Sequence, residues 1–174
     1  MGGFYAEFLT PLVGRSHTPT GEPLATAALA GVTAQRLRYL DLLFIEPWSV
    51  TLGEDWGAPT PTPLRIPNPA VFIAQKLLIH DDREPRKQSQ DLLYIHDTIE
   101  LFAEAWDDLA ALWRGRIGPR VELRWVDRLR SARSDLFGAV DDRLRDAARI
   151  PPYRTLDPWR RWAMCLGALE GLLG

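Results

Sequence analysis

Prolines are concentrated in the first part of the chain, and this distribution constrains the fold more than any other feature. Nine of the 14 prolines lie at or before Pro69. Proline fixes φ and lacks an amide hydrogen, so it interrupts both helices and central strands. Beyond Pro69 the apolar residues recur every three to four positions, the period of an amphipathic helix. We therefore expect an α+β chain, with strands and loops over 1–67 and helices over 68–174.

The strand-rich part is expected to form a small antiparallel or mixed sheet, followed by a layer of helices. Alternating apolar residues predict strands at 4–9, 48–52 and 64–66. The segment 38–46 is nearly continuous in large apolar residues and is predicted as a mostly buried strand, with 48–52 turning back beside it. Glycines and prolines mark 11–23 and 53–63 as loops.

Helix-start and helix-stop signals divide the second part of the chain. Asn68 before Pro69 is typical of a helix start, because Asn accepts from a free amide and proline needs no donor at the first helical position. Gly138 is expected to loosen the third helix locally. The four predicted helices cover 69–80, 89–113, the stretch between Pro119 and Pro151, and 158–173.

Charge is distributed unevenly, although the formal net charge is only -2. Residues 88–113 contain six acidic residues and no lysine or arginine, whereas 114–161 contain 13 arginines and seven acidic residues. This pattern favours helices with complementary, solvated faces over a nucleic-acid surface. The whole chain has only two lysines against 19 arginines, a general bias that makes the arginine count a weak sign of phosphate recognition.

Several classes of site are missing from the sequence. It has no glycine-rich phosphate loop before a helix, no Cys/His pattern with metal-ligand spacing and no nucleophile elbow. Cys165 is the single cysteine, and no apolar stretch reaches the roughly 18 residues of a membrane span. We expect a cytoplasmic protein that does not enter a membrane.

Four segments taken in order resemble a known family. They read FYAEFLTPLVG, LRYLDLLFIEPWSVTL, RIPNPAVFIAQKLLI and QDLLYIHDTIELF. Together they look like the latter part of a bacterial nucleotidyltransferase-like family related to AbiEii-type abortive-infection toxins, over about residues 4–105. The resemblance implies transfer of a nucleoside monophosphate from a nucleoside triphosphate to a protein or RNA acceptor such as tRNA, in a toxin–antitoxin setting.

The resemblance also implies nucleotide-binding residues. Lys76 would face the triphosphate, and Arg83, Arg86 and Lys87 would form a mobile positive rim. Asp91 would fix one of these cations or close the site. The alternative for Lys76 is a surface lysine whose stem lies along a half-buried helix, and for the rim a solvated turn.

The metal-binding part of the family pattern is incomplete here. In the family, a Gly-Ser or Gly-Gly turn precedes an Asp-x-Asp strand whose carboxylates hold Mg²⁺. Gly2 and Gly3 begin this chain, but no Asp-x-Asp follows at that spacing, and Glu7 matches only a third carboxylate. Glu7 is therefore the predicted catalytic and metal-binding residue, the cofactor is Mg²⁺, and the chain as given resembles a truncated or degenerate family member. A single carboxylate is a poor site for two hard cations.

Two other functions remain open from the sequence. One is a non-catalytic binding or regulatory module, and the other is an RNA-binding helical domain that uses the arginines of 114–149. An unpaired edge of the small sheet would also favour a homo-oligomer.

Overall fold

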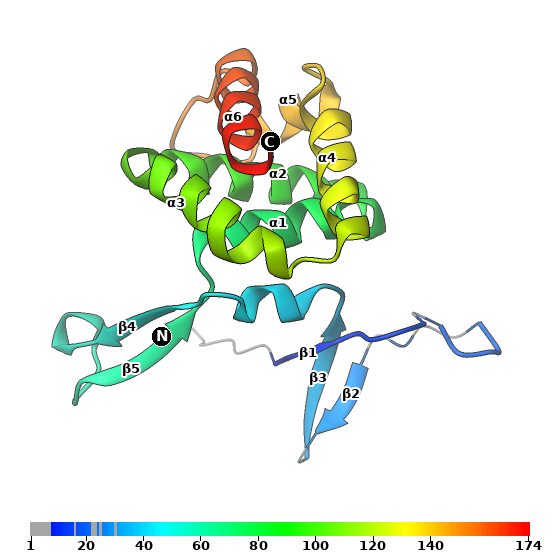
Figure 1. The fold of residues 1–174 in the computed structure, drawn as a ribbon, viewed down its shortest axis with the longest axis vertical. Helices are drawn as coiled ribbons and strands as arrows, with labels where there is room; N and C mark the ends of the chain where they lie inside the picture. Colours follow the sequence, from blue (N-terminus) through cyan, green and yellow to red (C-terminus); the bar gives the residue numbers. More distant parts are fainter. Residues whose placement is uncertain (1–7, 16, 22–23, 25, 30) are drawn as a thin grey trace. The chain divides into compact units, whose positions relative to one another are not determined.

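The structure is a computed structural model that describes residues 8–15, 17–21, 24, 26–29 and 31–174. It confirms the α+β class, since small sheets are followed along the chain by helices (Figure 1). The chain divides into two compact units, 1–41 and 42–174. The expected boundary near residue 67, between a catalytic remnant and a helical region, stays a prediction.

The first unit contains a three-stranded mixed sheet in the order β1-β3-β2. β1 (Leu9–Pro11) runs parallel to β3 (Val32–Leu37), and β2 (Thr26–Leu29) runs antiparallel to it. Gly31, with φ 81°, lies in the turn that joins β2 to β3, where a left-handed backbone suits glycine. The predicted strand at 4–9 lies mostly outside the described residues, and β2 and β3 had not been predicted.

The predicted strand at 38–46 is wrong. Leu40–Phe44 forms a 3₁₀ helix, flanked by Tyr39 at φ 56° and Glu46 at φ 49°. Such left-handed residues on both sides are incompatible with a continuous extended strand. The short helix buries Leu42 while Phe44 remains 65% exposed, so the apolar run does not mark one uniformly buried segment.

A two-stranded antiparallel sheet opens the second unit. β4 (Trp48–Leu52) pairs with β5 (Thr62–Ile66), with Val50 opposite Leu64. Both strands were predicted, but β4 was expected to pair with 38–46. The loop between them contains a 3₁₀ turn, Glu54–Trp56, closed by Gly57 at φ 72°.

Six α-helices complete the second unit in the described part of the chain. They are α1 (Pro69–Ile79), α2 (Pro85–Leu101), α3 (Trp106–Leu112), α4 (Leu123–Phe137), α5 (Asp142–Arg149) and α6 (Pro158–Leu173). α2 packs against α1, α5 and α6, and α4 packs against α1 and α6. Figure 1 shows α4 and α6 (yellow to red) standing over α1–α3 (green).

Two of the four predicted helices are interrupted. The helix expected over 89–113 ends at Leu101, because Phe102 leaves the helical backbone and stacks edge-on against Trp48 with ring centroids 5.4 Å apart. The helix expected after Pro119 ends at Phe137, and α5 then starts from Asp141, whose side chain accepts from the Leu144 amide. These breaks give six helices where four were expected.

The apolar stripes of α1, α2, α4 and α6 meet in one core. α1 is buried on nearly all sides, whereas the other helices keep a polar outer face. Within the described residues, no helix combines the length and apolar character that crossing a membrane would need.

Candidate functional site

The start of α1 is fixed by one buried side chain. Asn68 is fully buried, and its Oδ1 accepts from the Val71 amide at 3.1 Å, as the helix-start prediction required. Its Nδ2 donates to the carbonyl oxygens of Ile45 and Glu46 at 3.1 and 2.8 Å. Asn68 therefore ties the segment before β4 to α1 and sets where the helix places Lys76.

The structure brings three of the predicted site residues together. The Lys76 ammonium donates to Asp91 Oδ1 at 2.8 Å, and Arg83 Nε donates to Asp91 Oδ2 at 3.0 Å. The side chain of Asp91 is 3% exposed, that of Lys76 12% and that of Arg83 30%. We call these three residues the Asp91 cluster. One buried carboxylate thus holds two cations, which leaves a local charge of +1.

Two aromatic rings flank the Lys76 ammonium. Its nitrogen lies 5.5 Å from the centre of the Phe72 ring and 5.4 Å from that of Tyr94. Phe72 lies one helical turn before Lys76, so this contact follows from spacing along α1. Cation–π attraction and the Asp91 bond both hold the lysine side chain in this place.

The turn between α1 and α2 is held by Gln88. Its Nε2 donates to the carbonyl oxygens of His80 and Arg83 at 3.2 and 3.0 Å. This pair of bonds fixes the backbone from which the Arg83 side chain extends to Asp91. Gln88 therefore supports the turn that carries Arg83, and the mobility expected of the positive rim stays a prediction.

Arg86 and Lys87 do not join the Asp91 cluster. Both lie in the first turn of α2 and are exposed, and neither has an ion-pair partner among the described residues. Cations at a helix N-terminus repel the helix dipole, so they contribute no stability there. They add two free positive charges next to the turn that carries Arg83.

Glu7, the predicted catalytic and metal-binding residue, lies outside the described residues, so the structure does not place it. Among the residues that are described, one group has ligand atoms close enough to hold an ion: His96, Asp97 and Glu100, within 4.8 Å of one another. Arg154 is already paired with both carboxylates of that group. A guanidinium in this position disfavours a second cation.

Burial shifts the pKa values of His80, His96 and Cys165. Desolvation, helped by the Arg143 guanidinium, lowers the pKa of His80, and desolvation likewise lowers the pKa of His96 although Asp97 opposes it. Burial raises the pKa of the Cys165 thiol to about 12. A thiol of this kind is not a nucleophile at neutral pH.

The Asp91 cluster can present positive charge to a phosphate. Lysine has three N–H donors and arginine five, and Asp91 uses one from each. Two of the cations that the resemblance assigns to the triphosphate are thus held by one buried acid. Phe72 and Tyr94 were not predicted, although the four-residue spacing from Phe72 to Lys76 was a signal for the first.

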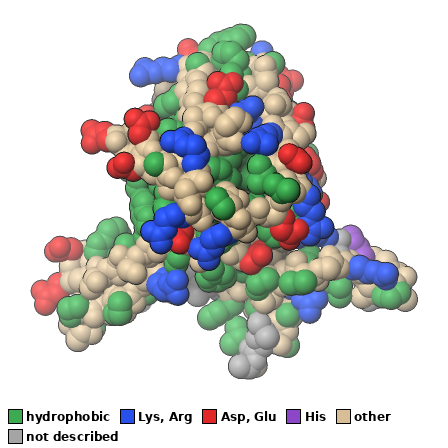
Figure 2. Space-filling view, viewed as in Figure 1, with side chains coloured by type: hydrophobic (Ala, Val, Ile, Leu, Met, Phe, Trp, Pro, Cys, Tyr) green, Lys and Arg blue, Asp and Glu red, His purple; other side chains and the backbone are tan. Residues whose placement is uncertain are grey.

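Five of the 13 arginines of 114–161 pair with an acid two or three residues away, and four more pair with acids elsewhere in the chain. Arg145 pairs with Asp142 and Arg149 with Asp146, both at three-residue spacing within α5. In the described residues of the acidic segment 88–113, Asp97 and Glu100 alone pair with this arginine set, through Arg154. Figure 2 shows basic and acidic side chains interspersed over the helical unit, as expected of solvated faces.

A family model described as nucleotidyltransferase matches residues 1–117, which include the whole Asp91 cluster. The chain belongs to this nucleotidyltransferase family. Membership implies transfer of a nucleoside monophosphate and a nucleoside triphosphate as substrate. No curated protein and no solved structure matches the chain. Helices α4–α6 lie beyond the matched residues.

Proposed function

We propose that this family member binds a nucleoside triphosphate at the Asp91 cluster, in a reaction that transfers the nucleoside monophosphate to an RNA or protein acceptor. The observation that carries the proposal is the shared, buried Asp91 carboxylate, which orients two cations inside the family-matched residues. The relationship to AbiEii-type toxins belongs to this proposal, as does a toxin role.

Each charged residue has a separate part in the proposal. Lys76 and Arg83 contact phosphate oxygens through the donors that Asp91 leaves free. Arg86 and Lys87 attract the anion at longer range, because both are exposed and neither is paired among the described residues. Asp91 is a positioning residue: it fixes the cations and does not touch the nucleotide.

Glu7 is proposed to supply one carboxylate to a Mg²⁺ site, as the resemblance implies. When bound, the metal neutralises charge that develops on the phosphoryl oxygens. With Glu7 as the one matching carboxylate in the sequence, the chain by itself is expected to bind triphosphate without transferring the nucleotide. Mg²⁺-dependent labelling of an acceptor by the purified chain, abolished in Glu7→Gln, would contradict this expectation.

Titration of the purified chain with ATP, CTP, GTP and UTP at two salt concentrations tests the binding step. We expect dissociation constants of roughly 0.1 to 1 mM that rise with salt, because the site has few donors. Lys76→Met keeps the stem and removes the charge, and it should weaken binding about tenfold. Arg86→Ala with Lys87→Ala should weaken it less and reduce the salt dependence.

The matched control is Arg130→Ala, which removes an exposed cation from α4, outside the family-matched residues. It should leave triphosphate affinity unchanged. Equal losses in Lys76→Met and Arg130→Ala would mean that affinity reflects overall charge, and the proposed site would be wrong. Unchanged affinity in Lys76→Met would leave the Asp91 cluster with a structural role alone.

A further inference from the structure

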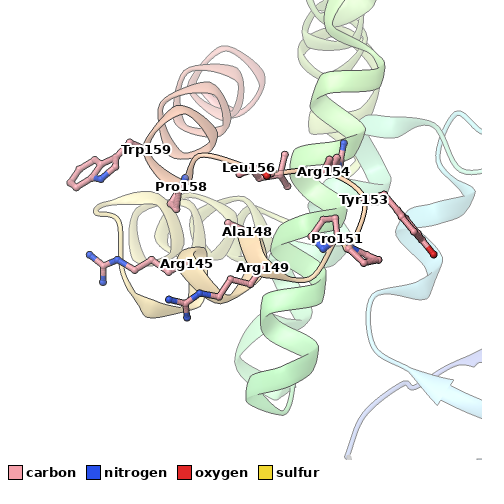
Figure 3. A pocket seen from close by; sticks show the side chains of 11 residues that line it. Arg145, Ala148, Arg149, Pro151, Tyr153, Arg154, Leu156, Pro158 and Trp159 are labelled. Atoms are coloured by element: carbon pink, nitrogen blue, oxygen red, sulfur yellow. The ribbon is translucent and has the colours of Figure 1, made fainter.

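A pocket of about 690 Å³ lies where the loop between α5 and α6 meets the two helices (Figure 3). Its volume is within the range of small-molecule binding sites. All of its lining residues fall between 145 and 159, beyond the family-matched residues. The pocket therefore lies outside the triphosphate site proposed above.

Two successive prolines restrict the loop that forms this pocket. The loop runs from Ile150 to Asp157, between α5 and α6, and contains one arginine, Arg154, and one acidic residue, Asp157. Pro151 and Pro152 fix φ at successive positions, so the loop loses little conformational freedom when a ligand binds. Arg154 is bound to Asp97 and Glu100 of α2 and anchors the loop to the helical core.

Two aromatic side chains on the pocket wall face solvent. Tyr153 is 98% exposed and Trp159 is 62% exposed. Trp159 lies at the start of α6, where its backbone amide donates to Asp157 Oδ1 at 2.8 Å. Its ring packs edge-on against that of Trp162, with ring centroids 6.3 Å apart. Large, exposed aromatic rings are platforms on which nucleobases stack.

Two arginines of α5 supply phosphate contacts beside these rings. Arg145 and Arg149 are 46% and 75% exposed, and each is paired with one acid of its own helix. Exposed pairs of this kind are weak, so a phosphate that can accept two parallel N–H bonds can replace the carboxylate. In Figure 3, Trp159, Arg145 and Arg149 lie toward one end of the pocket and Tyr153 toward the other.

We propose that this pocket binds single-stranded nucleic acid, represented by RNA in the tests below, with bases stacked on Tyr153 and Trp159 and the backbone phosphates on Arg145 and Arg149. The separation of the two rings favours a strand that spans several nucleotides over one free nucleotide. The acidic groups of a peptide would use the arginines alone, whereas a nucleic-acid strand would use the arginines through its phosphates and both rings through its bases. The site is independent of the triphosphate reaction and needs no metal.

Fluorescence anisotropy of a labelled 12-nucleotide oligouridylate with the full chain, in the absence of nucleoside triphosphate, tests the site. Tyr153→Ala and Trp159→Ala should each weaken binding roughly 5- to 100-fold, the loss expected for one stacked base. Trp159→Phe should recover most of the affinity, because it keeps an aromatic face. Tyr153 is almost wholly solvent-exposed, so its replacement does not threaten the fold.

Matched variants separate stacking and local charge from general effects. Trp56→Ala removes another exposed ring, 78% exposed, and should leave RNA affinity unchanged. Arg145→Ala with Arg149→Ala should lower the slope of log affinity against log salt by about 1.4, since each phosphate contact on a single strand contributes about 0.7. Arg130→Ala, from a similar exposed pair with Asp127 on α4, should leave that slope unchanged.

Competition experiments identify the class of ligand. A 12-base-pair RNA duplex should compete poorly, because its bases are already stacked. Free uridine monophosphate that competes as well as the oligonucleotide would overturn the proposal, as would polyglutamate that competes in the same way. Equal losses in the Tyr153, Trp159 and Trp56 variants would also overturn it.

Discussion

The Asp91 cluster and the arginine pairs of α5 are built from the same ion types, but they differ in burial. Asp91 is 3% exposed and holds two cations that come from different places along the chain. Asp142 is 90% exposed and holds one arginine three residues away on the same helix. A buried acid requires its partners to avoid an unpaired charge, whereas an exposed acid is solvated with or without them.

Because of this difference in burial, the Asp91 ion pairs hold the fold together, whereas the α5 ion pairs can open to bind a ligand. The Asp91 cluster fixes the turn between α1 and α2, so its charges are permanent features of the fold. The exposed ion pairs of the α5 arginines contribute little to stability, so these arginines can exchange their carboxylate partners for a ligand.

Replacement of Asp91 gives the largest expected effect. Asp91→Ala leaves Lys76 and Arg83 without their shared acceptor in a mostly buried place, so we expect the free energy of unfolding to fall by about 3 kcal/mol. Asp127→Ala on α4, where the acid is 78% exposed, should change it by less than about 0.5 kcal/mol. Urea denaturation of both variants measures the difference, and equal losses would remove the distinction between the regions.

His80 links the two regions and should make stability depend on pH. It is buried at the end of α1, and Arg143 of α5 lies 3.4 Å from its Nε2. Burial and Arg143 lower the pKa of His80 in the folded chain, while the carboxylates of Asp81, Asp91 and Asp141 oppose the shift. The unfolded chain, with an ordinary histidine pKa near 6.5, therefore binds more protons as the pH falls.

The stabilising contribution of neutral His80 is thus complete above pH 6.5 and is lost as the pH falls through the lowered folded pKa. One proton accounts for a slope of at most about 1.4 kcal/mol per pH unit. Unfolding measured between pH 7.5 and 5 should show this decline, and His80→Gln should reduce its slope. An unchanged slope in His80→Gln would assign the decline to other groups, such as His96.

Arg161 is a buried charge within the arginine-rich region, so it departs from the division between the two regions. It is 2% exposed, and its Nε and Nη1 have no hydrogen-bond partner among the described residues. Burial lowers the pKa of this guanidinium. Arg161→Met fills similar space without unpaired donors and should raise the free energy of unfolding by about 1 kcal/mol. A thermal melt that shows clear destabilisation would indicate that the hydrogen bond from Arg161 Nη2 to the Leu92 carbonyl oxygen, at 3.5 Å, outweighs the two unpaired donors.

Helix starts, which depend on neighbouring residues, could be predicted from the sequence better than tertiary contacts could. The start of α1 at Asn68 could be predicted, because capping involves neighbours along the chain. Gly138 was expected only to loosen one continuous helix, whereas α4 ends just before it, and a Cβ there would clash with the Ser134 carbonyl oxygen. The 3₁₀ helix at Leu40–Phe44 could not be predicted, because a continuous apolar run has no period that separates a strand from a helix.

The candidate site was predicted residue by residue but not as an arrangement. The family resemblance named Lys76, Arg83 and Asp91, yet nothing in their spacing indicates that one carboxylate binds both cations. That contact depends on how α2 folds back on α1 through a turn held by Gln88. The pocket beside Tyr153 had no sequence signal beyond the arginine count, because it forms from a loop whose conformation is set by its contacts with α2.

Double-mutant cycles compare the coupling free energy of an exposed ion pair directly with that of a buried one, and the exposed pair gives the smallest expected effect. For Arg149 and Asp146, both well exposed on α5, we expect a coupling free energy below about 0.5 kcal/mol at low salt. It should vanish in 1 M NaCl, where the screening length is about 3 Å. The coupling between Arg83 and Asp91 should exceed it and persist in salt, because water and ions do not reach the buried carboxylate. A large, salt-resistant coupling for Arg149 and Asp146 would mean that this arginine is held as firmly as the Asp91 cations, and RNA binding by α5 would then have to overcome that pair.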